Sequence, residues 1–450
     1  MSLVKKKQSA FFWVSVFLLG CRGYEARSQG IRMALDQNRP QVALQKANEA
    51  LGVERDQDFP EKLEGDNALL VLDRGTVQQA LCHFKESKRD LETADKAIDL
   101  LDMSRGALDE VGKHIFSDSS GRYKAPAYEK LLINTINMIN YLALGDLQGA
   151  RVEARRFNVI RCYLDDKPYR EGEGVIRLAG FLAGLIFEKS GEADEALRYY
   201  AEAWEQGEYA TLRQSIVGLL QKGVGYIPEN LRNLGENLPS STSARDSFQG
   251  EVIILVGYGR VPNKISNRVP IGQALNFASS FLDSRDIEAA DRLAAQGFIT
   301  WINYPSLAPE PPWIETPQCL LDGKLQLLEE AVNLSVEVQA AWKKIEGKII
   351  ASAITRLLAR YIAGEGARYL VGKDSIYGVL SSLVVRGGLT VMDTPDTRSW
   401  DVLPARVAVS RVRVPSGQHV IELSARGAVR KEQINIPQGG WVMVTLSSLR

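Results

Sequence analysis

Apolar residues recur with helical spacing through the first half of the chain, in pairs of short segments joined by tight polar turns. The clearest pair covers residues 176–204. Its first helix places small residues and one aromatic on one face: Gly180, Ala183, Gly184 and Phe187. Its second helix repeats the pattern with Ala196, Leu197, Tyr200 and Ala203. Small residues let two helices approach closely, and large ones fill the space between them. Such a pair cannot bury its apolar face alone, so it predicts similar neighbours.

Three further segments, 31–51, 67–101 and 128–161, show the same pattern. The second helix of each pair carries a small residue at one shared position: Ala43, Ser87, Ala150 and Ala196. The spacings are 44, 63 and 46 residues, whereas a regular tetratricopeptide (TPR) array repeats about every 34. We therefore expect a degenerate TPR-like helical repeat domain over residues 31–235, with one more helix pair over 211–234. An irregular helical bundle is the alternative.

The period of apolar residues changes after a polar linker at 235–249. Residues 251–258 form a β-rich run, and 264–270 is its expected hairpin partner. Residues 299–304 predict another strand, and residues 331–370 predict one long helix.

The tail alternates apolar and polar residues from 407 to 446, with turns at 415–417 and 439–440. This predicts a four-stranded antiparallel sheet that the earlier strands join. The expected fold class is therefore multidomain: an all-α TPR-like N-terminal half, and an α+β C-terminal half over 236–450 with an antiparallel sheet and one long helix.

The chain starts with three lysines at 5–7, followed by an apolar run at 10–19. That run is too short to span a bilayer, which needs about 20 residues. It ends in Leu18-Leu19-Gly20-Cys21, which is similar to a bacterial lipobox, although Leu19 is unusual at its position. We expect residues 1–20 to be a lipoprotein signal peptide and residues 21–30 a tether. Cys21 would carry a diacylglycerol and an N-acyl chain such as palmitate. A short uncleaved anchor and an ordinary secretory signal are the alternatives.

Arg22 follows the cysteine, where inner-membrane lipoproteins of enteric bacteria usually carry Asp. We therefore expect a cell outer membrane location, lipid-anchored and facing the periplasm. Basic and acidic residues are equal in number, 55 each, so no basic field indicates nucleic acid as a partner. Protein partners in the envelope are expected, and a homo-oligomer is a further alternative.

Chemistry that would mark an enzyme is absent from the sequence. Its three histidines, at 83, 114 and 419, lie far apart, and its cysteines have no zinc spacing. Cys82 and Cys162 form a disulfide in one interpretation and are buried free thiols in the other. The glycine-containing runs at 257–260 and 366–373 lack the spacing of nucleotide loops. We expect no enzyme activity, no metal and no cofactor besides the lipid.

The loop Asp396-Thr397-Arg398-Ser399-Trp400 admits two interpretations. Asp396 and Arg398 pin the loop to the sheet while Trp400 packs in the core, or Arg398 and Trp400 anchor a partner. Polar residues at first-helix positions are the other partner-binding candidates. They are Arg74, Gln78, Asn134, Asn137 and Asn140.

Taken together, the lipobox, the helix pairs, the strand at Gly250-Glu251-Val252 and the DTRSW…LP run ending at Leu403-Pro404 resemble an uncharacterised bacterial family of TPR-containing lipoproteins. Genes of that family often lie beside those of lipoproteins similar to penicillin-binding-protein activators. The resemblance implies a role at the cell envelope and supplies no catalytic residues.

The leading hypothesis is a membrane-anchored periplasmic TPR lipoprotein that acts as a protein-binding scaffold or assembly factor. One alternative is a structural component of an envelope secretion or motility machine, because the small-residue stretch 351–367 favours self-packing. A second is an enzyme acting on peptidoglycan or another glycan, for which Asp396, Glu251 and Arg398 are the only candidates.

Overall fold

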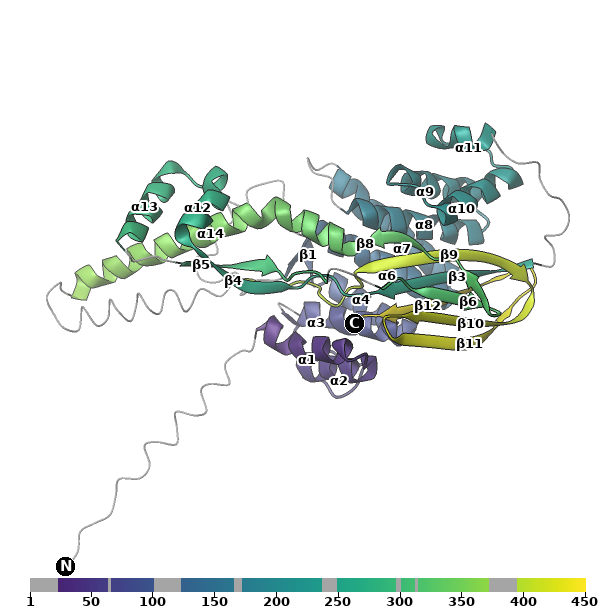
Figure 1. Cartoon of the computed structure of the whole chain (residues 1–450), viewed down its shortest axis with the longest axis horizontal. Coiled ribbons are helices and arrows are strands. Elements are labelled where there is room, and N and C mark those ends of the chain that lie inside the picture. The colour runs from purple at the N-terminus through teal and green to yellow at the C-terminus, as the bar shows by residue number, and fades with distance from the viewer. Residues whose placement is uncertain are drawn as a thin grey trace, which may run out of the picture.

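The chain forms a helical array, two packed β-sheets and a projecting arm (Figure 1). The computed structural model describes residues 23–63, 66–100, 123–165, 172–236, 249–296, 301–311, 315–371 and 395–450. The predicted signal peptide, Cys21, His114 and most of the predicted linker lie outside these residues.

Eight helices of the N-terminal half form antiparallel pairs, as the apolar pattern predicts. They are α1–α2 (Tyr24–Asp36, Pro40–Leu51), α3–α4 (Asp66–Ala80, Phe84–Asp95), α6–α7 (Ala127–Ala143, Leu147–Asp165) and α8–α9 (Glu173–Lys189, Ala193–Glu205). A short parallel pair of strands, β1 (Asp99–Leu100) and β2 (Lys124–Ala125), lies between α4 and α6. The array continues with α10 (Ala210–Lys222), η2 (Glu229–Leu231) and α11 (Arg232–Glu236).

The turn inside each helix pair has the same backbone conformation. One residue in each turn is left-handed, with φ between 56° and 81°: Asn38, Cys82, Gly145 and Gly191. Each of them lies five residues before the small residue of the second helix, so the spacings of 44, 63 and 46 recur in the turns. The repeat register predicted from the sequence is therefore confirmed, and the N-terminal half is a TPR-like helical array.

Close helix approach is clearest between α8 and α9. A Cβ on Gly184 would lie 2.3 Å from Tyr200 Cδ1, and one on Gly180 would lie 3.0 Å from Ala203 Cβ. The rings of Phe187 and Tyr199 stack with centroids 5.3 Å apart. Small residues therefore let these two helices touch, as the sequence predicts.

The predicted tether over residues 21–30 is wrong from Tyr24 onward. Helix α1 begins at Tyr24, whose side chain is only 2% exposed. Tyr24, Ser28 and Ile31 are buried at helical spacing. The buried face of this helix therefore starts seven residues before residue 31, where the hydrophobic pattern predicted the helical segment to begin.

Two four-stranded sheets form the centre of the C-terminal half. The first has the order β12 (Trp441–Ser448), β3 (Gln249–Tyr258), β9 (Arg406–Pro415) and β8 (Glu329–Asn333). The second has the order β11 (Ala428–Ile436), β10 (Gly417–Ala425), β6 (Gln318–Leu321) and β7 (Lys324–Gln326).

Strand β3 pairs with β9 antiparallel and with β12 in parallel. The predicted sharing of one sheet by 251–258 and the tail is therefore confirmed. The predicted four-stranded antiparallel sheet of the tail is wrong, because the tail is divided between two sheets. Strand β3 is apolar on both faces and takes a tail strand on each side, which is typical of a central strand. Alternation marks each strand but does not say which neighbour it joins.

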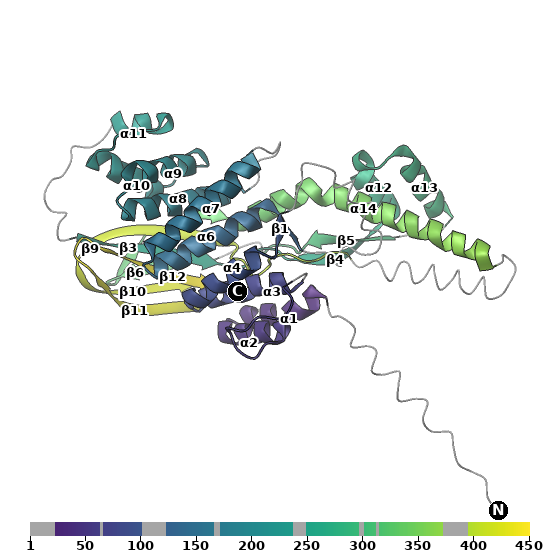
Figure 2. The ribbon, with the colours of Figure 1, turned by 180° about the vertical axis from the view of Figure 1, so that it is seen from behind.

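The first sheet lies between the helices and the second sheet. Ile253 and Leu255 on β3 belong to the same core as the helical array, while Val252, Ile254 and Val256 pack with the second sheet. Figure 2 shows helices α6 to α8 covering the sheet from the other side. The two halves of the chain therefore share one hydrophobic core, although their secondary structure changes near residue 235.

An arm extends from this body (Figure 1). It consists of the long helix α14 (Leu334–Val371), the hairpin β4–β5 (Lys264–Pro270, Trp301–Leu307), α12 (Ile271–Ala278), η4 (Ser279–Phe281) and α13 (Ser284–Ala295). The long helix is confirmed, but β4 pairs with β5, so its predicted pairing with 251–258 is wrong.

The arm has a core of its own that uses part of the small-residue stretch of α14. Ala351 and Ala353 are fully buried there, with residues of α12, α13 and β5. A Cβ on Gly347 would lie 2.4 Å from Phe281 Cε2. Small residues in the described part of the stretch therefore serve packing inside the arm and are not offered for self-association. None of the described helices combines the length and apolar character needed to cross a bilayer.

Candidate functional site

The groove of a TPR-like array is its expected binding surface, and here the chain's own C-terminal half fills it. First helices of the pairs line this groove, and α3, α6 and α8 contact strands β12 and β8 of the first sheet. Helices α6 and α8 are consequently buried on nearly every face, from Ala127 to Leu142 and from Val175 to Phe187.

All five predicted partner-binding residues of the helices are buried, with side chains at most 1% exposed: Arg74, Gln78, Asn134, Asn137 and Asn140. A partner cannot reach them while the two halves are packed. Their prediction as a surface contact is therefore not supported by the structure. A polar residue in a helix can face water or can be buried with a hydrogen-bond partner, and the sequence did not show which of the two applies here.

Arg74, Asn134 and Asn140 bind other helices, within a helix pair or between pairs. Arg74 Nε lies 2.6 Å from Asp90 Oδ2, and its Nη1 donates to the carbonyl oxygen of Asp58 at 2.9 Å. Asn134 Nδ2 donates to Glu153 Oε2 at 2.8 Å. These bonds satisfy buried polar groups that would otherwise cost free energy.

Asn140 connects α6 to α4, because its Nδ2 donates to Ser87 Oγ at 2.9 Å. Asn137 Oδ1 lies 3.3 Å from the same nitrogen. Gln78, on α3, is completely buried. The hydrogen bonds of Arg74, Asn134 and Asn140 therefore help to hold the helical array together.

The loop at 396–400 is fixed to the helices, not to the sheet. Arg398 Nε and Nη2 donate to Asp396 at 2.8 and 2.7 Å. Trp400 is 1% exposed, and its Nε1 donates to Thr76 Oγ1 on α3 at 3.0 Å. Its backbone N–H donates to Glu129 Oε1 on α6 at 3.1 Å. The loop therefore has the packing role that the first interpretation gave it, but it packs on α3 and α6 and not on the sheet.

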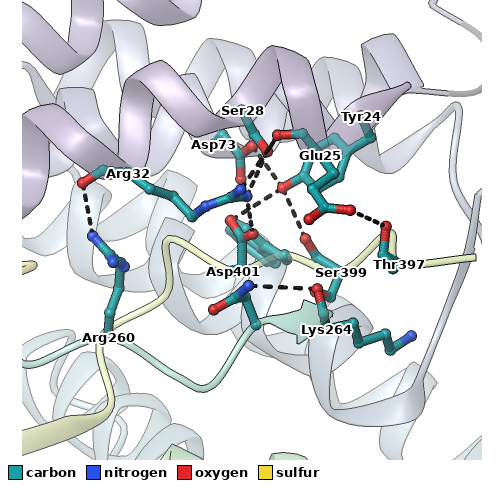
Figure 3. A network of polar contacts seen from close by, with 12 residues as sticks. Tyr24, Glu25, Ser28, Arg32, Asp73, Arg260, Lys264, Thr397, Ser399 and Asp401 are labelled. Atoms are coloured by element: carbon teal, nitrogen blue, oxygen red, sulfur yellow. Dashed lines mark hydrogen bonds and ion pairs between the residues drawn. The ribbon is translucent and has the colours of Figure 1, made fainter. Parts of the chain in front are cut away.

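A second contact, which we call the Tyr24 network, consists of Tyr24, Arg32, Asp73 and Asp401 (Figure 3). The Tyr24 hydroxyl lies 2.9 Å from Asp73 Oδ2, 2.8 Å from the carbonyl oxygen of Ser399 and 3.2 Å from Asp401 Oδ1. Arg32 Nη1 lies 2.7 Å from Asp401 Oδ2. Helix α1, helix α3 and the end of the 396–401 loop therefore meet at one phenol.

The Tyr24 phenol has one proton to offer to three neighbouring oxygens. A phenol donates one proton, and the Ser399 carbonyl can only accept. If Tyr24 donates to Ser399, the Asp73 carboxyl must donate to the phenol oxygen. Burial raises the pKa of Asp73 well above its ordinary value, and the charge of Asp401 adds to the effect. Burial therefore favours the neutral acid form of Asp73.

A third contact, the Arg411 network, joins α8 to β3 and β9. It consists of Glu188, Lys189, Glu251 and Arg411. The Arg411 guanidinium binds both carboxylates, and its Nη1 donates to Ser215 Oγ at 2.9 Å. Burial opposes ionisation of Glu188, but the hydrogen bond and charge of Arg411 outweigh it and lower the pKa of Glu188 to about 2.

Catalytic use of the enzyme candidates has no support in this geometry. Glu251 is bound by Arg411 and Lys189, and Asp396 is bound by Arg398. Among the described residues, no group of His, Cys, Asp and Glu could hold a metal ion. The three cysteines in the described ranges, Cys82, Cys162 and Cys319, are free thiols, so the alternative of a Cys82–Cys162 disulfide is wrong for this structure.

Sequence analysis missed the residues that join the two halves: Tyr24, Asp73, Glu129, Asp401 and Arg411. One signal was available. Asp73 follows Leu69-Leu70-Val71-Leu72, and α8 reads as apolar around its whole circumference. A helix that is apolar on all sides is buried on all sides. Polar residues on or next to such a helix are therefore expected to hydrogen-bond inside the protein.

No protein-family model and no curated protein matches this sequence. Among solved structures, the chain is similar to MamA, with 12% identity over 48% of this chain and 85% of that chain and a TM-score of 0.29. PilF of Pseudomonas aeruginosa has 10% identity, coverage of 48% and 78%, and a TM-score of 0.28. Apo RapI has 10% identity, coverage of 84% and 76%, and a TM-score of 0.32. Scores this low carry no argument, so the TPR-like assignment rests on the helix pairs and turns described above.

Proposed function

We propose that this protein is a non-enzymatic scaffold, lipid-anchored at Cys21 to the periplasmic face of the outer membrane, which binds another envelope protein. The single observation that carries the scaffold is that the helical array and the sheets form one body with a filled groove. A body of this kind presents fixed outer surfaces to a partner. It does not offer the open groove in which TPR superhelices bind peptides.

Several outer surfaces carry exposed large apolar side chains, and we single out helix α7 and the arm. Helix α7 presents Val152 and Val159, which are 48% and 69% exposed. The arm presents Phe277 and Trp301, which are 51% and 45% exposed. Apolar side chains on an outer face are suited to burial against a partner protein, and these two surfaces are therefore the expected contacts.

Photocrosslinking in intact cells tests the scaffold. A photoreactive amino acid replaces Val159 on α7, Phe277 on the arm, or Val429 on β11, which is 64% exposed and serves as the control. We expect a discrete adduct with the same envelope protein from position 159 or 277 and none from position 429. Recovery of only abundant bystander proteins from all three positions would contradict a specific partner.

The anchor is tested separately by labelling with a clickable palmitate analogue. We expect the wild type to be labelled and to fractionate with the outer membrane, and Cys21→Ala to lose both properties. Equal labelling of the two proteins would exclude Cys21 as the acylated residue.

A further inference from the structure

Very little chain separates Cys21 from the folded body. Helix α1 begins at Tyr24. Three steps along the backbone therefore join the two Cα atoms, and a fully extended chain covers at most about 3.6 Å in each step, or about 11 Å in all. The point at which a group is attached to Cys21 therefore lies close to Tyr24, and only the length of the group itself can extend its reach.

Tyr24 itself is fixed in the body. Its side chain is 2% exposed, and its hydroxyl is surrounded by oxygens of α3 and the 396–401 loop. Arg27 Nη2 donates to the carbonyl oxygen of Ala50 at 2.7 Å and to Asn67 Oδ1 at 2.6 Å. The first two turns of α1 thus cannot swing away without breaking buried hydrogen bonds.

The first turns of α1 and the adjoining loop form one small surface, which we call the anchor face. It consists of the exposed residues Glu25, Ala26 and Gln29 and the half-buried residues 395–397. Thr397 Oγ1 lies 3.3 Å from Glu25 Oε2, so the two segments are in contact (Figure 3).

We infer that the anchor face lies directly against the lipid headgroups of the bilayer, so that the membrane holds the body in one orientation without a flexible spacer. This inference rests on the proposed acylation of Cys21. The partner it specifies is a phospholipid headgroup surface, placed by the acyl chains, each methylene of which contributes about 0.8 kcal/mol when buried.

The charge of the anchor face indicates how it meets the membrane. Glu25 and Asp396 are acidic, and Arg398 is only 4% exposed, so the face has no basic cluster to attract anionic lipid. Contact therefore depends on the acyl chains and not on headgroup charge. The arm starts beside this face, because Lys264 Nζ at the start of β4 donates to the carbonyl oxygen of Arg398 at 3.1 Å. The base of the arm is consequently held near the bilayer.

Headgroup quenching tests the orientation. The acylated protein, with Cys82→Asn and Cys162→Ser to remove the accessible thiols, receives a fluorophore at Gln29→Cys on the anchor face. The control carries it at Tyr226→Cys, a position 68% exposed in the segment between α10 and η2, at the other end of the array from α1. Both are placed in vesicles of phosphatidylethanolamine and phosphatidylglycerol that contain a lipid with a nitroxide on its headgroup. We expect emission at position 29 to fall by about half, because the short chain keeps it within contact range, and emission at position 226 to stay unchanged.

A matched variant isolates the missing spacer. About twelve Gly and Ser residues inserted between Arg22 and Gly23 span roughly 19 Å on average, and we expect them to abolish the quenching at position 29 while acylation, checked by intact mass, persists. Equal emission at positions 29 and 226 in acylated protein would overturn the orientation and leave the anchor intact. A mass without acyl chains would overturn the anchor, and the inference with it.

Discussion

The two polar networks that join the helices to the C-terminal half do the same structural task with opposite electrostatics. The Arg411 network supplies two cations, Arg411 and Lys189, to two carboxylates, Glu188 and Glu251. Attraction to these cations outweighs burial, so the pKa of Glu188 and that of Glu251 are both lowered.

The Tyr24 network contains one cation, Arg32, for the two carboxyl groups of Asp73 and Asp401, and Arg260 adds a weaker attraction at Asp401. Burial dominates here and raises the pKa of both carboxyl groups. A buried carboxyl group is thus kept ionised where enough positive charge faces it, and takes up a proton where that charge falls short. The Arg411 network therefore loses stabilising free energy as the pH falls, and the Tyr24 network loses it as the pH rises.

The largest effect is expected from removing a whole side of the junction. Deleting residues 405–450 takes β9 and β12 away from β3, which is buried on both faces. An unpaired apolar strand favours aggregation. We expect the 22–404 fragment to be aggregated in gel filtration, and a folded monomer would refute the shared sheet.

The reciprocal fragment, residues 22–235, makes a sharper test. Nearest-neighbour packing in repeat arrays alone predicts a soluble helical fragment. The shared core predicts the opposite, because the inner faces of α6 and α8 would lose the sheet that covers them. We expect aggregation when the fragment is made alone, and a soluble complex when residues 236–450 are co-expressed. A monomeric fragment with native helix content by circular dichroism would show that the sheet is dispensable.

Within the Arg411 network, Arg411→Ala leaves Glu188 and Glu251 buried with only Lys189 to balance them. Breaking a buried ion pair by removing one partner lowers the free energy of unfolding by about 3–5 kcal/mol. Urea unfolding of the protein lacking residues 1–21 measures this. Arg413→Ala, two residues along the same strand and exposed, is the control and is expected to change stability by less than about 0.5 kcal/mol.

The acid limb of the stability profile isolates Glu188. Its folded pKa of about 2 lies below the ordinary 4.5, so its contribution is complete above pH 4.5 and is lost as the pH falls toward 2. The size of that contribution is about 3 kcal/mol. We expect Glu188→Gln to flatten this acid limb in unfolding measurements between these pH values. An unchanged acid limb would mean that Glu188 is not ionised in the folded protein.

The smallest effect is expected at Asp73. Its folded pKa is raised, so the folded state holds a proton that the unfolded chain releases, and stability falls as the pH rises above the ordinary value of 3.8. Asp73→Asn keeps the shape of the side chain and offers an N–H donor to the Tyr24 oxygen. Because the amide does not ionise, this variant avoids the loss of stability at higher pH. We expect it to be at least as stable as wild type at neutral pH, with an advantage that grows as the pH rises above 3.8 and levels off above the folded pKa of Asp73. A variant that is clearly less stable at every pH would show that Asp73 is ionised when folded.

Local features of the chain were predictable from the sequence. The spacing of Ala43, Ser87, Ala150 and Ala196 determines the register of the helix pairs, because each position reports only on its own turn and on the helix that packs beside it. The change of period near residue 250 and the long helix were predictable for the same reason. Helical and strand periodicity can each be recognised within a short window of neighbouring residues.

Only the tertiary structure decided what each element faces. Strand alternation does not specify partners, so the division of the tail between two sheets, and the parallel pairing of β12 with β3, had no local signal. The buried state of Asn134 and Asn140 depends on Glu153 and Ser87 in other helices. The start of α1 at Tyr24 likewise depends on oxygens more than 370 residues away in the chain. Polar side chains look alike in a sequence whether water or a distant hydrogen-bond partner satisfies them, and that choice is made only when the two halves pack together.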